Sequence, residues 1–399
     1  MKTALMTALS PPSLRPRLAG AGRVPLARRN LWANKARLLR SLAGIGFAVL
    51  LMLMQLGFER AFFQSSLQVI ELLDGDLFIQ NAHKYRFVTR QPFPPADLDR
   101  ARRVQGVASV RPFYADWYSS FWRNPYDGKV FMVRAFAFDP DQPVFLLPAV
   151  NAHLAALKAP DAVLVDRRAR PFLGMGGTAT AAAFNGRPVH IVGRFALGPD
   201  FQNDGTVIMS ARSFANLLPP GAARGVEAGI IKLKPGADPG VVAAALKRVL
   251  PSDIAVFTKA QLYAFERDFE ARVSSAGVIF AMGTIVGFVV GALIAYQIVY
   301  TDLTDQLPQY ATLKAIGYGP SYIVGVVLRQ AGLLALGGWV PAFFVSLLLY
   351  RWIGNLALIP LGTSLYIVGV SFALTLFMCL LSAALAMIRV VAADPAEVF

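Results

Sequence analysis

Four long stretches without an acidic or basic residue dominate the pattern of hydrophobic and polar positions along this chain. They cover residues 41–58, 273–301, 330–350 and 352–388. About 20 apolar residues in a helix cross the roughly 30 Å hydrocarbon core of a bilayer. Gly354, Pro360 and Gly362 interrupt the last stretch. Buried helices of a soluble protein are the alternative, but the pattern favours four transmembrane helices, at residues 41–63, 273–301, 322–350 and 364–388.

The basic residues are concentrated at the start of the chain. The sequence has 39 Lys+Arg against 24 Asp+Glu, a net charge of +15, and residues 1–40 hold nine basic residues and no acidic one. Basic residues beside a first span keep that side in the cytoplasm. We therefore expect residues 1–40 to form a cytoplasmic tail, with an interfacial helix at Pro25–Leu42. A cleaved signal peptide and a nucleic-acid-binding arm are less favoured alternatives, and we expect no nucleic-acid partner.

The remaining topology follows from alternation across the membrane. The pattern predicts a multi-pass membrane protein, with both termini in the cytoplasm and one large outer domain. In a bacterial cell this places the chain in the inner membrane and the domain in the periplasm. The outer segment is only mildly basic, but long domains are translocated largely regardless of charge. The predicted segments outside the spans are a periplasmic domain at residues 64–272, a cytoplasmic loop at 302–321, a short outer turn at 351–363 and a cytoplasmic tail at 389–399.

The periplasmic segment predicts an α+β domain. Two β-α-β units bracket an insertion at residues 114–224, which we expect to form a β-rich lobe. The first unit comprises Asp76–Gln80, Pro94–Val104 and Val107–Phe113, and the second Glu227–Leu233, Pro239–Leu250 and Ile254–Phe257.

The insertion begins with a dense aromatic run: Tyr114, Trp117, Tyr118, Phe121, Trp122 and Tyr126. Strict alternation in a strand places Trp117 and Phe121 on one face, and Tyr118 and Trp122 on the other. An exposed patch that binds a lipid or a partner is one interpretation. A strand buried on both faces is the simpler one.

The sequence contains no recognisable catalytic site. It has no G-x-x-x-x-G-K-[ST] phosphate-binding loop and no G-x-S-x-G nucleophile motif, and its three histidines lack the spacing of metal ligands. Asp74 and Asp76 are interpreted as turn residues, and Asp97 and Asp99 as residues of a first helical turn. We expect no catalytic residue, bound cofactor or metal. The predicted helix interiors also carry no charge, which argues against a polar substrate path through this chain.

Small residues recur at fourfold spacing in two predicted helices. Such stripes let a second helix approach closely, in the same chain or in another copy. The stripes are Gly283, Gly287, Gly291 and Ala295 in the second span, and Ser371, Thr375, Cys379 and Ala383 in the fourth.

The inner loop predicts a short helix beside the membrane. Asp302 and Asp305 suit a helix amino terminus, Lys314 suits its last turn, and Gly317 or Gly319 can end it. Leu307, Tyr310, Ala311 and Lys314 share one face of this helix. The face is either a docking surface for a partner or part of an ordinary loop.

Several segments in matching order resemble the DevC-type permeases of ABC exporters, within the MacB/FtsX/LolC-like superfamily. They are Leu42-Ala-Gly-Ile-Gly-Phe-Ala48, Met54-Gln-Leu-Gly-Phe58, Phe138-Asp-Pro-Asp-Gln-Pro-Val-Phe145, Val165-Asp-Arg-Arg168, Leu307-Pro-Gln-Tyr-Ala-Thr-Leu-Lys-Ala-Ile-Gly-Tyr318 and Ala393-Asp-Pro-Ala-Glu-Val-Phe399. Residues 1–25 depart from the family pattern as a Pro/Arg-rich tail.

The resemblance implies a non-catalytic subunit of an ABC exporter. Such permeases form homodimers, bind a separate ATPase that carries ATP-Mg, and transmit its motion to their periplasmic domains. A periplasmic membrane-fusion adaptor and an outer-membrane channel complete such an exporter. The implied substrate is lipid-like or amphiphilic, because the DevC-type permeases are named for an exporter of glycolipids. An FtsX-like signalling subunit that regulates an envelope enzyme without transport is the alternative. The implied ATPase-coupling residues are Asp302, Asp305, Tyr310, Thr312, Lys314, Gly317 and Tyr318.

Overall fold

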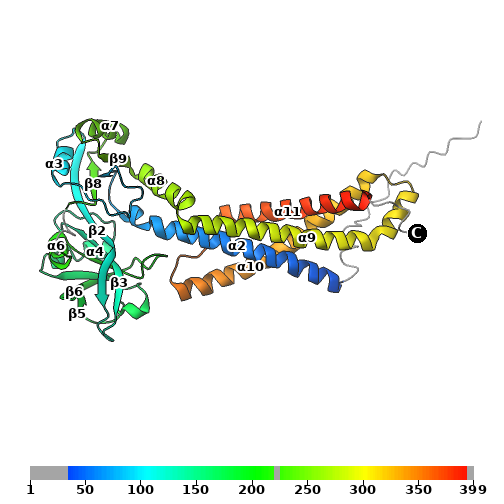
Figure 1. Ribbon diagram of the computed structural model, residues 1–399, viewed down its shortest axis with the longest axis horizontal. Coiled ribbons are helices and arrows are strands. Elements are labelled where there is room, and N and C mark those ends of the chain that lie inside the picture. Colours follow the sequence, from blue (N-terminus) through cyan, green and yellow to red (C-terminus); the bar gives the residue numbers. More distant parts are fainter. Residues whose placement is uncertain (1–34, 220–224, 393–399) are drawn as a thin grey trace, which may run out of the picture. The chain divides into compact units, whose positions relative to one another are not determined.

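The computed structural model describes residues 35–219 and 225–392 (Figure 1). Within these residues, four helices are long and apolar enough to cross a membrane, which agrees with the hydropathy pattern. They are α2 (Lys35–Leu72), α9 (Ser275–Ala315), α10 (Pro320–Ala357) and α11 (Leu365–Ala392). The basic tail before residue 35, most of the predicted interfacial helix and the chain after residue 392 lie outside the described residues.

The helices extend well beyond the predicted spans. Hydropathy marks the part of a helix that lies in hydrocarbon, not the ends of the helix. The expected helix start at Asp302 is therefore wrong, because α9 continues unbroken from Ser275 through Asp302 to Ala315. No glycine occurs between residues 292 and 316 to end it earlier. Likewise α10 passes through much of the predicted outer turn and ends at Ala357.

The chain divides into two compact units, whose boundaries fall inside the four long helices. The sheet unit comprises Gly46–Gly291 and Trp339–Thr375. Of the described residues, the helical unit comprises 35–45, Ala292–Gly338 and 376–392. The strands described below all belong to the sheet unit.

One half of the sheet contains the two predicted β-α-β units. Its strands have the order β2-β8-β1-β9, and all neighbours are antiparallel. This interleaving of two units is the split β-α-β arrangement. Apolar side chains of α3 and α7 form one core cluster with these strands. The elements are β1 (Leu77–Asn81), α3 (Ala96–Arg102), β2 (Val107–Arg123), β8 (Ala228–Leu233), α7 (Pro239–Val249) and β9 (Ile254–Thr258).

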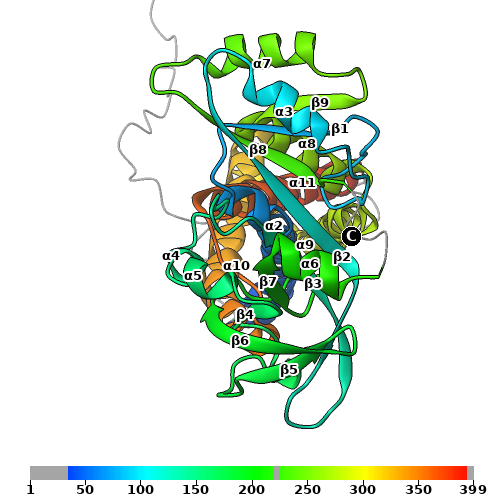
Figure 2. The same cartoon turned by 90° about the vertical axis from the view of Figure 1, so that its left-hand side faces the viewer.

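The other half is the β-rich lobe, which β2 enters without a break (Figure 2). Its strands follow the order β2-β3-β7-β4-β6-β5, and β5 pairs again with β2, so the ring of strands is closed. Closure removes the exposed strand edges on which other chains could pair. The lobe comprises β3 (Val130–Phe138), α4 (Pro148–Asn151), α5 (Leu154–Leu157), β4 (Ala162–Asp166), η1 (Pro171–Leu173), β5 (Ala181–Phe184), β6 (Arg187–Phe195), β7 (Thr206–Ser210) and α6 (Ala211–Leu217).

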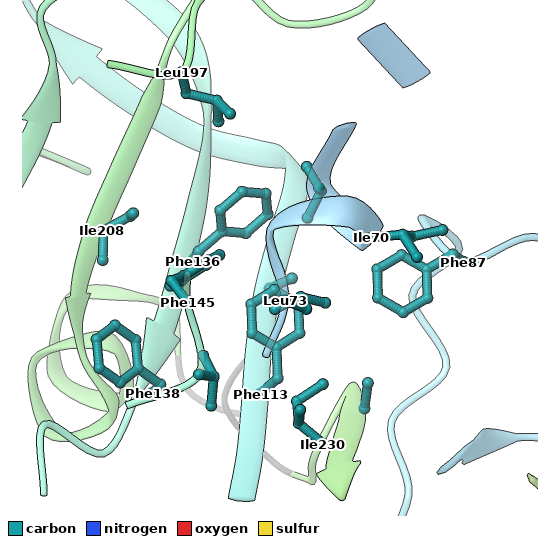
Figure 3. Packing of buried hydrophobic residues seen from close by; sticks show 14 of the residues in the cluster. Ile70, Leu73, Phe87, Phe113, Phe136, Phe138, Phe145, Leu197, Ile208 and Ile230 are labelled. Carbon is teal, nitrogen blue, oxygen red and sulfur yellow. The ribbon is translucent and has the colours of Figure 1, made fainter. Parts of the chain in front are cut away.

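The last turns of α2 lie in the hydrophobic core of the sheet unit. Leu67, Ile70 and Leu73 are buried, and they belong to one apolar cluster with Phe113 and Phe136 (Figure 3). Full burial of one such side chain stabilises the fold by about 1.5–3 kcal/mol. The end of α2, beyond the first predicted span, is therefore anchored in the domain that follows it.

The aromatic run on β2 departs from the predicted alternation. Trp117 and Trp122 are 4% and 0% exposed, whereas Tyr118 and Phe121 are 42% and 49% exposed. The register between β2 and β3 shifts within residues 116–120, and such a bulge turns the following side chains to the other face. The prediction that Trp117 and Phe121 share a face is wrong for this reason. The prediction that the strand is buried on both faces is also wrong, because Tyr118 and Phe121 are exposed.

Candidate functional site

Asp302 connects three helices of the helical unit. Its carboxylate pairs with Arg37 of α2 and accepts a hydrogen bond of 3.3 Å from Nε2 of Gln330 on α10. Asp305, on the next turn of α9, pairs with the same Arg37 at 3.0 Å. Asp302 is only 7% exposed, and a charge pair is stronger where water is largely excluded. The sequence pointed to both carboxylates but not to Arg37 or Gln330, because the basic tail offers several equivalent arginines.

The end of α9 is a glycine turn. Gly317 has a φ angle of +100°, and the N–H of Tyr318 donates to the carbonyl of Leu313 at 3.1 Å. This bond is characteristic of the Schellman motif, in which glycine takes the left-handed position. Of the two glycines that the sequence offered as the end of this helix, the structure uses Gly317 and not Gly319.

Tyr310 lies inside the helical unit, although the sequence placed it among the contact residues. Its exposed fraction is 7%, and its hydroxyl donates a hydrogen bond of 2.9 Å to Oε1 of Gln306. A phenol that is buried to this extent has little surface for a partner. Its hydrogen bond joins two successive turns of α9.

The accessible surface of this segment is formed by other side chains. Thr312 and Tyr318 are exposed, and so is the apolar Ile316, at 70%. The side chain of Lys314 lies outside the part that the structure describes. An uncovered isoleucine beside two polar side chains is a suitable surface for a partner protein. We refer to residues 302–318 as the coupling segment.

The predicted stripe on α9 faces α2 of the same chain over part of its length. A Cβ added at Gly283 would lie 2.5 Å from Cδ of Gln55, and one at Gly287 would lie 3.3 Å from Cγ of Met52. These glycines therefore allow α2 and α9 to approach closely within one chain. Gly291 and Ala295 are buried as well.

Helix α8 (Lys259–Arg272), which joins the sheet to α9, presents two buried glutamates to the domain. Glu266 is 1% exposed and Glu270 is fully buried. Arg86, from the loop after β1, lies 3.1 Å from Oε1 of Glu270 and 3.7 Å from Oε1 of Glu266. The ion pair between Arg86 and Glu270 therefore holds the loop against α8.

A second buried ion pair joins the same loop to the residue before β8. Lys84 is 3% exposed and is 2.6 Å from the carboxylate of Glu227. Burial lowers the pKa of Lys84, although Glu227 opposes this effect.

Burial also raises the pKa of Glu266 to about 7, although the Phe87 N–H and Arg86 favour its charged form. The sequence did not reveal this ionic cluster, because its members lie far apart along the chain.

The junction between α8 and α9 depends on a glycine. Gly277, in the first turn of α9, lies against the last turn of α8, and an added Cβ would be 3.0 Å from the carbonyl carbon of Glu270. Only a residue without a Cβ fits this approach. The chain thus passes from the domain into the second membrane helix through a tight connection at residues 273–274 (Figure 1).

The carboxylates considered as catalytic pairs are engaged in ion pairs. Lys232 lies 3.0 Å from Asp74 and 3.2 Å from Asp76. Burial opposes ionisation of Asp74, but hydrogen bonds from Lys232 and Arg111 outweigh it and lower the pKa of Asp74. Asp97 likewise pairs with a neighbouring arginine at 3.0 Å. In the described ranges, no three His, Cys, Asp or Glu side chains are arranged to hold a metal ion.

Two family models match the chain. The MacB-like periplasmic core domain matches residues 40–249. The FtsX-like permease C-terminal region matches residues 281–395. The first match covers more than half of the chain and the second covers most of the remainder. Curated proteins give no match.

Solved structures show weaker likeness. The periplasmic region of MacB from Actinobacillus actinomycetemcomitans has 14% identity and a TM-score of 0.36, and the match covers 50% of this chain and 97% of that chain. The extracellular domain of the noncanonic ABC-type transporter YknZ from Gram-positive bacteria has 11% identity and a TM-score of 0.31, with coverages of 47% and 99%. The relationship rests on the family models.

Proposed function

The chain belongs to the MacB-like and FtsX-like family of ABC transporter permeases, and from this premise we propose that it is the transmembrane subunit of an ATP-driven exporter. Permeases of this family work with ABC ATPase partners. A separate ATPase chain binds ATP-Mg and hydrolyses it. The present chain is non-catalytic, binds no cofactor and transmits the ATPase motion to its outer domain.

The continuity of α2 is the observation that supports this proposal most directly. α2 is one helix from Lys35 to Leu72, and its last turns are buried in the core of the sheet unit. A helix without a break resists bending more than a loop does, so displacement at one end moves the other. The tight connection between α8 and α9, beside Gly277, provides a second link between the domain and a membrane helix.

The coupling segment is the proposed contact with the ATPase. In this proposal the contacts with the ATPase are Thr312, Lys314 and Tyr318. The segment keeps its shape through Asp302, Asp305, Tyr310 and Gly317. Two copies of the permease assemble with two ATPase subunits in the inner membrane, with termini in the cytoplasm. A periplasmic membrane-fusion adaptor and an outer-membrane channel receive a lipid-like or amphiphilic substrate, as the DevC resemblance implies.

Charge reversal in the coupling segment tests the ATPase contact. Lys314→Glu is expected to reduce co-purification of the ATPase at least about tenfold, because a like or unpaired charge in an interface is costly. Lys247 is an exposed lysine at the end of α7. The variant Lys247→Glu is the matched control and is expected to leave co-purification of the ATPase unchanged. Normal ATPase binding and ATP turnover in the Lys314→Glu complex would overturn the assignment.

A deletion strain separates transport from signalling. Loss of an amphiphile from the outer envelope, restored by the wild-type gene, is expected for an exporter. Normal envelope lipids together with misregulated hydrolysis of the cell wall would instead indicate the FtsX-like signalling subunit. Genes for an adaptor and an ATPase beside this reading frame would favour the tripartite exporter.

A further inference from the structure

A pocket of about 640 Å³ lies in the sheet unit where α10 ends. Its walls are the last turns of α10, the connection at residues 358–363, and one side chain of the β-rich lobe, Arg168. Its volume is in the range of small-molecule pockets. Leu358, in the wall, has a φ angle of +56°, which is a strained conformation for a residue other than glycine.

Arginines surround this pocket without acidic partners. Arg168 and Arg351 line it, and Arg60 of α2 donates a hydrogen bond to the backbone carbonyl of Thr363 in its wall. Among the described residues, none of these three guanidinium groups forms an ion pair, and no acidic residue lines the pocket. By contrast, Arg170 pairs with an aspartate at 2.7 Å. The pocket is therefore locally cationic.

The aromatic residues near the pocket indicate its depth in a membrane. Trp352 in the last turns of α10 and Tyr366 in the first turn of α11 are 65% and 74% exposed. Exposed Trp and Tyr on membrane helices concentrate at the level of the lipid headgroups. Leu348 and Leu356 on α10 are 70% and 73% exposed and extend an apolar surface from that level. A cationic pocket thus adjoins a surface suited to acyl chains.

We propose that this pocket binds the acidic headgroup of a lipid from the surrounding bilayer. The lipid phosphate lies between Arg168 and Arg351, and its acyl chains lie along the exposed leucines of α10. The planar guanidinium fork matches a phosphate, and hydrogen bonds between charged groups are stronger than neutral ones. The hydroxyl of Thr363, which lacks a hydrogen-bond partner within the described chain, is a further donor in the wall.

The test uses full-length protein purified in detergent. Native mass spectrometry counts the lipid retained after incubation with phosphatidylglycerol or phosphatidylcholine. The wild type is expected to retain the anionic lipid selectively, and Arg168→Gln/Arg351→Gln to lower its affinity about tenfold or more, because two charged hydrogen-bond donors are lost. Arg248 is an exposed arginine on α7. The variant Arg248→Gln is the matched control and is expected to retain the anionic lipid.

Equal retention of the two lipids by the wild type would overturn the proposal, and so would unchanged selectivity in the double variant. Displacement of phosphatidylglycerol by millimolar inorganic phosphate would also overturn it, because the pocket would then bind free anions. If the double variant melts at a lower temperature than the wild type, the measurement is repeated with the single variant Arg351→Lys. This variant keeps the positive charge but loses the planar guanidinium group. Reduced selectivity in that variant supports the site and wild-type selectivity contradicts it. None of these outcomes depends on the ATPase contact.

Discussion

The ring of Tyr350 on α10 lies over Gly57 of α2, and its hydroxyl donates a hydrogen bond to the backbone carbonyl of Leu53. A Cβ at residue 57 would lie 2.6 Å from Cζ of this ring, far inside the usual separation of carbon atoms. Gly57 therefore permits α2 and α10 to pack closely in the sheet unit. Its place in the Met54–Phe58 segment of the family resemblance thus has a packing reason.

Gly57→Ala is expected to destabilise the protein by about 1–3 kcal/mol, because the new methyl group displaces the ring or the helix. The thermal midpoint of the purified protein in detergent measures this loss. Gly369→Ala on α11 is the matched control, since an added Cβ there meets no atom within 4 Å, and its midpoint is expected to stay or rise slightly. A wild-type midpoint for Gly57→Ala would contradict the described packing.

Asp302→Asn is expected to cost about 1–3 kcal/mol, because it leaves Arg37 without its buried charged partner. Asp305→Asn is the matched control. It removes a contact with the same arginine, but the Asp305 side chain is 55% exposed against 10% for Asp302. An exposed pair contributes little, so a change within about 0.5 kcal/mol is expected. Equal losses in the two variants would show that burial does not distinguish the carboxylates.

Stability is expected to fall as the pH rises from about 5 to above 7. Burial raises the pKa of Glu266 in the folded state from its ordinary value of 4.5 to about 7, so the folded state binds more protons than the unfolded state in this window. The loss is on the order of 3 kcal/mol once Glu266 ionises. Thermal midpoints measured between pH 5 and pH 8 record it.

Glu266→Gln is expected to flatten this pH dependence, because the amide keeps an acceptor for the Phe87 N–H but does not titrate. Asp268→Asn on the exposed face of α8 is the matched control, since the Asp268 side chain is 60% exposed, and it should leave the slope intact. A slope that persists in Glu266→Gln would assign the effect to another group.

Cys379 is expected to be protected from thiol reagents until the protein unfolds, because its side chain is 1% exposed on α11. Maleimide labelling followed by mass spectrometry measures this, and denaturant should make the reaction complete. Leu365→Cys provides the accessible comparison, because Leu365 is 92% exposed. Rapid labelling of Cys379 in the folded wild type would mean that α11 packs differently.

The hydropathy pattern predicted the spans, and the local periodicity predicted both β-α-β units of the domain. Both kinds of signal depend on neighbours within one element. The pattern failed where a nonlocal feature intervened. A bulge against β3 turned Phe121 outward. The prediction of a helix start at Asp302 failed because charge in a membrane protein marks the edge of the apolar region and not the end of a helix.

The sequence by itself determined the four apolar helices, the alternation of strands and helices in the domain, and the lack of a phosphate-binding loop. Only the tertiary structure decided which residues of distant segments meet. It paired Arg37 with Asp302, grouped Arg86 with two glutamates of α8, and placed Arg168 in one pocket with Arg351. Periodicity follows from the geometry of a single element, whereas these contacts depend on which of many chemically equivalent partners the packed elements bring together.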